Sequence, residues 1–327
     1  MAPILDACGP LPGLTNQASR LLCAGGAGTG KTFLAIETAR RKVASGLSVN
    51  FVCFSQPLAA FIAAQVGMEN DLIKVVPISQ IEGLPEADYL VVDEGQDLMN
   101  AENLSTLGDL VKEGLEKGNW AFFFDANFQV GVLGSFDQSA YEELNRYSTN
   151  SQTLTKNCRN TKKIVAQVSD TLGIEMEEHE AIEGIPVTEM YFNSVEEGAE
   201  NLEEKITYLL NEGIKHEEIT VLTRCDPADD EIVSALPGSI ATKFENMTQN
   251  NAASPPVGRI QLARIDLYKG LENRYVFVLA SNSNASTTLD GIKNELYVGM
   301  TRAQIGLYLV LDSDLKPEIQ ALNETNV

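Results

Sequence analysis

One glycine-rich segment of the chain has the residue types and the spacing that hold phosphate groups. Residues 25–32 read GGAGTGKT, between a short apolar run and a stretch with helical periodicity. Glycines let successive backbone N–H groups surround phosphate oxygens, a lysine adds positive charge, and a threonine hydroxyl can bind Mg²⁺. The pattern therefore predicts a site for nucleotide phosphates, built from the following residues: Gly26, Ala27, Gly28, Thr29, Gly30, Lys31 and Thr32.

A pair of carboxylates follows a second apolar run. Residues 89–94 read YLVVDE, so Asp93 and Glu94 stand at the end of an expected buried strand. Asp93 can hold Mg²⁺ through water together with Thr32, and Glu94 can orient or deprotonate an attacking water molecule. Because the sequence has no guanine-reading N-K-x-D segment, a GTPase is not favoured.

The elements that must position these residues alternate along the chain. Short apolar runs predict strands, and amphipathic stretches between them predict helices. The expected strands span 20–25, 48–54, 73–76, 89–93, 120–125, 219–222, 259–263, 274–279 and 306–311, and the expected helices span 30–44, 56–66, 100–117, 161–172 and 195–210. This alternation predicts an α/β fold of two parallel-sheet domains, residues 1–150 and 151–327.

Six segments have the sequence and order of known helicase motifs. They are residues 51–60 (FVCFSQPLAA), 93–97 (DEGQD), Asp125 with Gln129, 154–161 (LTKNCRNT), 269–272 (KGLE) and 297–303 (YVGMTRA). In this order they resemble motifs Ia, II, III, IV, V and VI of UvrD/Rep-type superfamily 1A helicases. The resemblance runs from about Leu21 to Val310, and it is nearest to compact bacterial relatives that are often joined to, or partnered with, a nuclease.

The resemblance implies two RecA-like domains that bind ATP and Mg²⁺ at their interface and act on single-stranded DNA, or on RNA. It implies that Gln129 senses the γ-phosphate, and that Arg159 and Arg302 reach it from the second domain as arginine fingers. It also implies that Glu272 approaches the ribose and that Gln17 is the candidate reader of adenine. Planar, bidentate arginine donors suit a transition state that spreads charge over phosphate oxygens.

Several residues with which the family binds single-stranded nucleic acid are absent from the sequence. Motif III continues Val130-Gly131-Val132-Leu133 where the family has a tyrosine and a stacking Trp-Arg pair. Trp120, the single tryptophan, precedes an apolar run and is expected in the core. Phe54 is the remaining stacking candidate, with a buried strand-end position as the alternative. Because stacking contributes about 1–3 kcal/mol per base, we expect strand binding that is weak or assisted by a partner, such as a nuclease.

Composition limits the other classes of function. The 327 residues carry a formal net charge of −22, which argues against a membrane-surface or nucleic-acid-coating protein. Five widely spaced cysteines and two histidines support neither a disulfide framework nor a zinc site. With no basic segment ahead of an apolar run at the start, and no long apolar stretch, we expect a cytoplasmic protein without a membrane partner.

Three functions remain open from the sequence. The first is an ATP-driven helicase or translocase on a single strand, within a DNA repair or antiviral complex. The second is an ATP-switched interaction module that regulates a partner nuclease, with little helicase activity of its own. The third is a nucleotide or small-molecule kinase. The two distant arginines in helicase-like segments argue against it.

Overall fold

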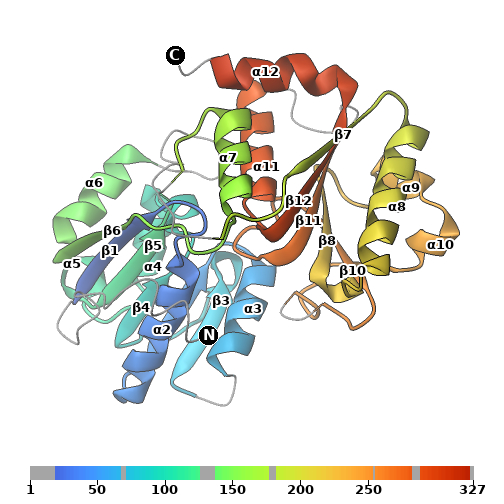
Figure 1. Ribbon diagram of the computed structural model, residues 1–327. Coiled ribbons are helices and arrows are strands. Elements are labelled where there is room, and N and C mark those ends of the chain that lie inside the picture. Colours follow the sequence, from blue (N-terminus) through green and yellow to red (C-terminus); the bar gives the residue numbers. More distant parts are fainter. Residues whose placement is uncertain are drawn as a thin grey trace. The chain divides into compact units, whose positions relative to one another are not determined.

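The chain forms two α/β units, each built on its own sheet (Figure 1). The computed structural model describes residues 19–67, 71–125, 137–176, 182–252, 255–281 and 288–324. The first unit ends at Cys158 and the second begins at Arg159. The sequence placed the boundary at 150/151, but β6 (Asn150–Leu154) pairs with β1 (Arg20–Gly25) and therefore belongs to the first sheet.

The first sheet has six parallel strands. Their order is β3 (Ile73–Pro77), β2 (Val49–Cys53), β4 (Tyr89–Val92), β5 (Trp120–Phe124), β1 and β6. Every residue of β2, β4 and β5 is buried, because a parallel sheet is covered on both faces. The sequence prediction of the other five strands is confirmed to within a residue or two at each end; β6, whose first four residues are polar, was missed.

Helices cover both faces of this sheet. They are α2 (Lys31–Ala44), α3 (Gln56–Val66), α4 (Ala101–Gly108), α5 (Gly114–Lys117) and α6 (Gln138–Tyr147). Leu104 of α4 and Leu144 of α6 pack with Leu22, Leu90 and Trp120 on one face. The other face is covered by α2 and α3 (Figure 1). Trp120 is fully buried, as predicted, and its indole donates to the carbonyl of Leu115 at 2.8 Å.

The single helix expected over 100–117 is wrong, because the chain leaves the helix between α4 and α5. The backbone of Ala87 exchanges hydrogen bonds with this segment, donating to Leu110 O and accepting from Lys112 N, both at 3.0 Å. Asn50 also donates its side-chain amide to Leu110 O at 2.9 Å. These bonds to the sheet replace helical ones, and Glu113 then adopts a left-handed conformation with φ 66°.

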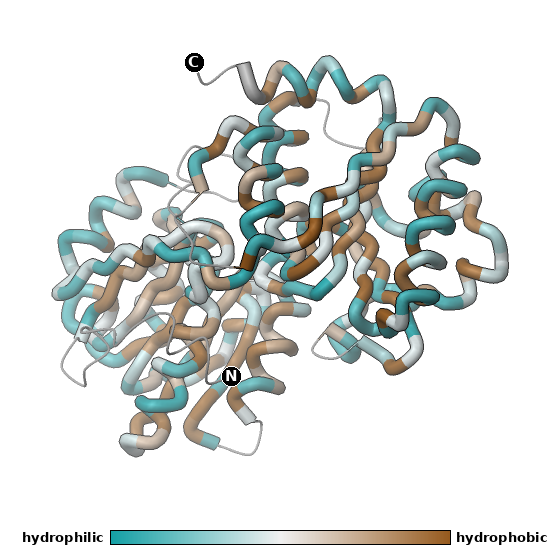
Figure 2. Tube along the Cα trace, in the orientation of Figure 1, coloured by the Kyte–Doolittle hydropathy of each residue, from teal (hydrophilic) through white to brown (hydrophobic). Residues whose placement is uncertain are grey.

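The second sheet is also parallel and six-stranded. Its order is β7 (Thr188–Phe192), β12 (Ala303–Asp312), β11 (Asn273–Ala280), β8 (Ile219–Thr223), β10 (Ile260–Arg264) and β9 (Phe244–Asn246). β8, β10, β11 and β12 confirm predicted strands, whereas β7 and β9 were missed. Figure 2 shows the apolar strands lying inside layers of helices whose outer faces are hydrophilic.

Helices again cover both faces of the second sheet. They are α7 (Lys162–Leu172), α8 (Val195–Asn211), α9 (Glu231–Ala235), α10 (Gly238–Ala241), α11 (Leu289–Met300) and α12 (Lys316–Glu324). α8, α9 and α10 pack into one apolar cluster with the sheet, and α7, α11 and α12 contact one another. Over the residues that the structure describes, no helix combines the length and apolar character that a membrane span requires.

Candidate functional site

The glycine-rich segment forms the turn between β1 and α2. Gly28 and Gly30 have φ values of 81° and 88°, a left-handed conformation that glycine adopts without steric penalty. Gly30 is the N-cap, so the helix begins at Lys31. The first N–H groups of a 14-residue helix therefore face the turn, as the sequence predicts.

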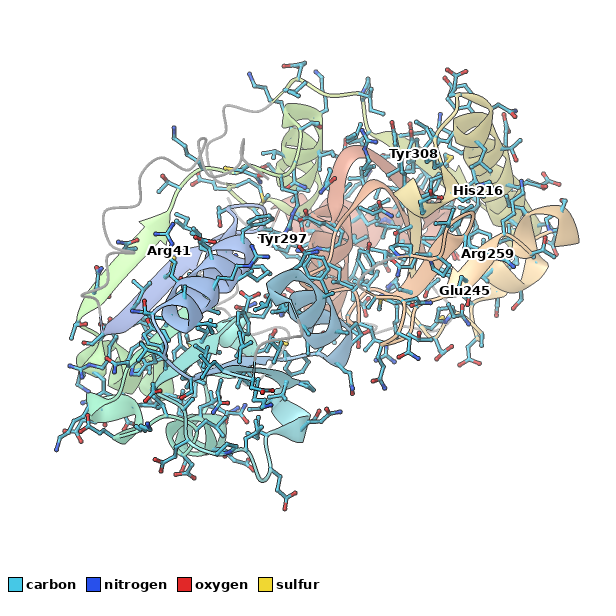
Figure 3. All side chains as sticks on the ribbon, turned by 90° about the horizontal axis from the view of Figure 1, so that it is seen from below. Arg41, His216, Glu245, Arg259, Tyr297 and Tyr308 are labelled. Atoms are coloured by element: carbon cyan, nitrogen blue, oxygen red, sulfur yellow. The ribbon has the colours of Figure 1, made fainter. Side chains whose placement is uncertain are left out.

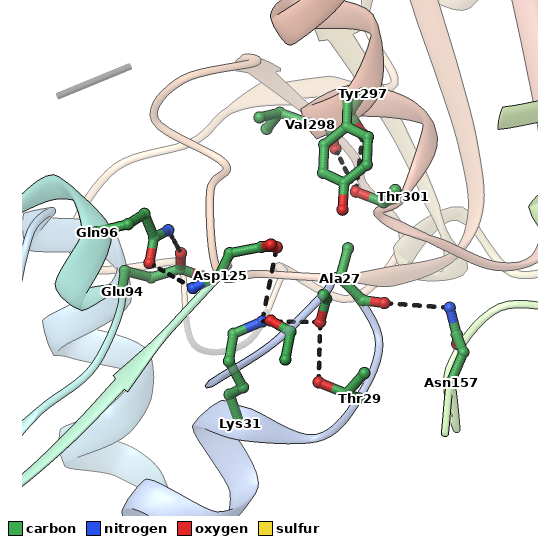
Figure 4. Close-up of polar contacts among 12 residues, drawn as sticks. Ala27, Thr29, Lys31, Glu94, Gln96, Asp125, Asn157, Tyr297, Val298 and Thr301 are labelled. Atoms are coloured by element: carbon green, nitrogen blue, oxygen red, sulfur yellow. Dashed lines mark hydrogen bonds and ion pairs between the residues drawn. The ribbon is translucent and has the colours of Figure 1, made fainter. Parts of the chain in front are cut away.

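Lys31 is buried and engaged by oxygen atoms of its own unit (Figure 4). Its ammonium group donates to Gly25 O at 2.7 Å and to Gly26 O at 2.8 Å, and it lies 3.6 Å from Asp125 Oδ2. The Thr29 hydroxyl also donates to Gly26 O, at 2.8 Å. Phosphate oxygens would offer the ammonium charged acceptors, which are stronger than the two carbonyls it contacts in this structure.

Asp93 immediately follows β4, and its carboxylate is fully buried. Among the described residues, neither of its oxygens has a hydrogen-bond partner of standard geometry. Burial and then the neighbouring charge of Glu94 raise the pKa of Asp93 to about 7, while Thr32 and Lys31 act in the opposite direction. A buried carboxylate beside the Thr32 hydroxyl supplies the oxygen ligands that a hard divalent cation such as Mg²⁺ prefers.

We expect Asp93→Asn to stabilise the protein at pH 8 in the absence of nucleotide and divalent cations. The folded protein binds the Asp93 proton more tightly than the unfolded chain, whose ordinary pKa is 3.8. The contribution of Asp93 to stability is therefore fully present below pH 3.8 and is lost as the pH rises through about 7. The melting temperature of the variant should exceed that of the wild type by about 2–8 °C at pH 8.

At pH 5 this difference in melting temperature should shrink, because Asp93 is then protonated in the folded wild type, and it should disappear below pH 3.8, where the unfolded chain binds the proton as well. Asp109→Asn, at an exposed position at the end of α4, is the matched control. A wild-type protein that melts above Asp93→Asn at pH 8 would contradict the view that the buried carboxylate destabilises the empty site.

Glu94 is held in an unusual backbone conformation next to Asp93. Its φ of 53° and ψ of 41° lie in the left-handed region, which residues other than glycine rarely adopt and which often marks functional sites. The Gln96 amide donates to Glu94 Oε2, and Gln96 Oε1 accepts from Asp125 N at 2.9 Å (Figure 4). Gln96 therefore fixes the Glu94 carboxylate relative to the end of β5.

The predicted arginines and Glu272 meet within the second unit. Arg159 forms an ion pair with Glu272, whose other oxygen accepts from Gln304 Nε2 at 2.7 Å. Burial alone would raise the pKa of Glu272, but Arg159, the bond from Gln304 and the charge of Arg302 outweigh it, and the pKa is lowered. Glu272 is therefore a carboxylate, and in this structure its partner is Arg159.

Arg302 follows α11 and is buried among backbone oxygens. Its guanidinium donates to Val298 O at 2.9 Å, to Leu271 O at 3.4 Å and to Thr301 Oγ1 at 2.9 Å. The Thr301 hydroxyl is in turn bonded to the last turn of α11, where it donates to Tyr297 O at 2.8 Å (Figure 4). Both predicted fingers are thus bound to groups of their own unit.

Other sequence predictions fall at different places. Gln17 and Gln129 lie outside the described residues. Phe54 directly follows β2 and is 45% exposed, so its alternative placement in the core is wrong. His216, one of the two histidines and labelled in Figure 3, lies in the short 3₁₀ helix His216–Glu218 that leads into β8. The described part of the chain contains no cluster of three or more histidine, cysteine or acidic side chains suited to a metal.

Solved structures share this architecture. Mss116p bound to single-stranded RNA and AMP-PNP superposes on 99% of this chain and 72% of its own, with a TM-score of 0.61 and 13% identity. The chain has the fold of two RecA-like domains. Arterivirus nonstructural protein 10, a helicase, matches with a TM-score of 0.49 and 14% identity over 94% of this chain. The chain spans only 63% of that helicase. No protein-family model and no curated protein sequence matches the chain.

Proposed function

We propose that the protein is an Mg²⁺-dependent ATPase of the helicase type that acts on single-stranded nucleic acid. The observation that carries this proposal is the cluster in the first unit. A glycine loop and helix N-terminus hold Lys31, and the buried acids Asp93 and Glu94 follow β4, which β5 separates from β1 in the same sheet. Such a cluster has the parts needed to hold phosphates, to bind a cation and to activate water.

Each residue of the cluster has a proposed task. The loop N–H groups and Lys31 bind the β- and γ-phosphates, and Thr32 and Asp93 hold Mg²⁺, which supplies charge to the phosphate oxygens when bound. Glu94, oriented by Gln96, accepts a proton from the attacking water. For the second unit, the resemblance to UvrD/Rep-type helicases supports Arg159 and Arg302 as γ-phosphate ligands that leave their present partners. Gln129, Gln17 and Glu272 keep their proposed roles at the γ-phosphate, the adenine and the ribose.

The proposed substrate is single-stranded DNA, with RNA as the other candidate. The helicase-like segments support single-stranded DNA, and the similarity in fold to Mss116p, whose solved complex contains single-stranded RNA, supports RNA as the alternative. Phe54 offers an exposed ring for stacking. The net charge of −22 argues that the protein binds the strand weakly, or together with a partner such as a nuclease. The proposed setting is a cytoplasmic repair or antiviral complex.

We expect single-stranded DNA to stimulate ATP hydrolysis several-fold at low salt, and the stimulation to fall steeply as salt is raised. Phe54→Ala should leave basal hydrolysis unchanged and weaken strand binding by about 5–100-fold, the loss of one stacked base. Leu72→Ala, at a comparably exposed apolar residue of the same unit, is the control. The measurement is hydrolysis titrated with oligodeoxythymidine and oligouridine, together with fluorescence anisotropy.

The second candidate function is the ATP-switched interaction module. Its supporting observations are the acidic charge and the burial of Trp120, which leaves the single tryptophan unable to stack on a base. Hydrolysis that neither strand changes, with no strand binding at low salt, would favour this module over the motor.

A further inference from the structure

Two buried asparagines flank Arg159 where the chain passes from the first unit to the second. Asn157 is 2% exposed and Asn160 is 1% exposed. The unit boundary falls between Cys158 and Arg159, so one asparagine belongs to each unit. Each uses its side-chain amide to bind backbone carbonyls of a segment already placed in the proposed site.

Asn157 is bound to the phosphate loop. Its Nδ2 donates to Ala27 O at 3.1 Å (Figure 4), and the next backbone N–H, of Cys158, donates to Gly28 O at 2.8 Å. The fit is tight, because a Cβ built on Gly28 would lie 2.5 Å from Asn157 Oδ1. A movement of the loop at Ala27 or Gly28 therefore has to move Asn157, or break these bonds.

Asn160 is bound to the segment that carries Arg302. Its Nδ2 donates to Thr301 O at 3.0 Å and to Ala303 O at 2.7 Å. These two carbonyls stand on either side of Arg302, so one amide group fixes the backbone from which the Arg302 side chain departs. The same residue is the direct neighbour of Arg159.

We propose that Asn157 and Asn160 are positioning residues, which couple the phosphate loop to the two arginines; this inference rests on the proposed ATPase function. Three residues of chain keep the Cα atoms of Asn157 and Asn160 within about 11 Å of each other. When phosphates draw Lys31 away from Gly25 O and Gly26 O, a shift of the loop is passed through Asn157 to Arg159. Asn160 holds the backbone on both sides of Arg302, so that Arg302 moves together with Arg159.

The test is steady-state ATP hydrolysis by Asn157→Ala and Asn160→Ala, with Asn157→Asp and Asn160→Asp as a second pair. Alanine removes the N–H donors and leaves a small space, whereas aspartate removes them and keeps the shape. Both kinds of variant at position 160 should lower kcat by about 10–100-fold with KM changed little, because a misplaced catalytic group reduces the rate and not the binding. Both kinds at position 157 should lower kcat and also raise KM for ATP.

Asn50 provides a matched control. It is equally buried, and its Nδ2 donates to two carbonyls, Pro85 O and Leu110 O, both at 2.9 Å and both away from the phosphate loop. Asn50→Ala should lower the melting temperature as Asn160→Ala does, yet keep kcat within about twofold, since the bonds it loses have a structural role only.

The outcomes separate the inference from the function on which it rests. If Lys31→Ala abolishes hydrolysis but either asparagine pair keeps the wild-type kcat, the ATPase stands and the coupling is overturned. If Asn50→Ala lowers kcat as much as Asn160→Ala, the effect is one of general stability and the coupling is again overturned. If the wild-type protein does not hydrolyse ATP, the proposed function fails, and the inference fails with it.

Discussion

Lys31→Ala should reduce ATP hydrolysis by about 10²–10³-fold, the loss expected when one electrostatic contact to a developing charge is removed. Lys31 is buried, and its ammonium group lies where Gly25 O and Gly26 O converge at the mouth of the loop. Alanine cannot supply the charge that a transferred phosphoryl group requires. The measurement is phosphate release at saturating ATP and Mg²⁺.

The control for Lys31→Ala is Lys74→Ala, which removes an exposed lysine from β3 of the same sheet. The control should hydrolyse ATP at the wild-type rate. Because Lys31 also contacts Asp125, the melting temperature of each variant is measured alongside the rate, so that unfolding is not mistaken for lost chemistry. A folded Lys31→Ala protein with wild-type hydrolysis would remove the phosphate loop from the mechanism.

The central strands of both sheets could be predicted because they are almost entirely apolar runs. VNFVC and WAFFF are buried at every position, and such runs identify themselves without any tertiary information. β6 was missed because its first four residues, NSQT, are polar, β7 because only the last residue of TEMYF is buried, and β9 because it has only three residues. α4 and α5 were merged because the bonds that interrupt them come from Ala87 and Asn50, far away in the sequence.

The candidate site was predictable in its residue types but not in its contacts. The glycine-rich segment predicts Lys31 as a phosphate ligand, and the end of the apolar run at residues 89–92 predicts Asp93 and Glu94 as the acids of the site. Nothing local shows that Glu94 is left-handed, or that Gln96 joins it to β5, because the bond between Gln96 and Asp125 N spans 29 residues of sequence. The contacts of Asn157 and Asn160 are likewise invisible in the LTKNCRNT segment, since their acceptors are carbonyls more than a hundred residues away.

Glu94→Gln should lower kcat by about 10²–10⁴-fold, the usual contribution of a general base. Glutamine has nearly the same size and can still accept the hydrogen bond from Gln96, so the local geometry should persist. What it cannot do is take a proton from the attacking water. ATP affinity should therefore change little, and the variant should accumulate bound ATP, measured by single-turnover hydrolysis and nucleotide binding.

Glu113→Gln is the matched control for Glu94→Gln, because Glu113 is the other described non-glycine residue with a positive φ, and its side chain is exposed. The same chemical change in the same kind of backbone should leave hydrolysis intact. If both variants lose activity together, the left-handed backbone and not the carboxylate is responsible. If Glu94→Gln hydrolyses ATP at the wild-type rate, the base must be sought elsewhere, and the buried Asp93 is the next residue to test.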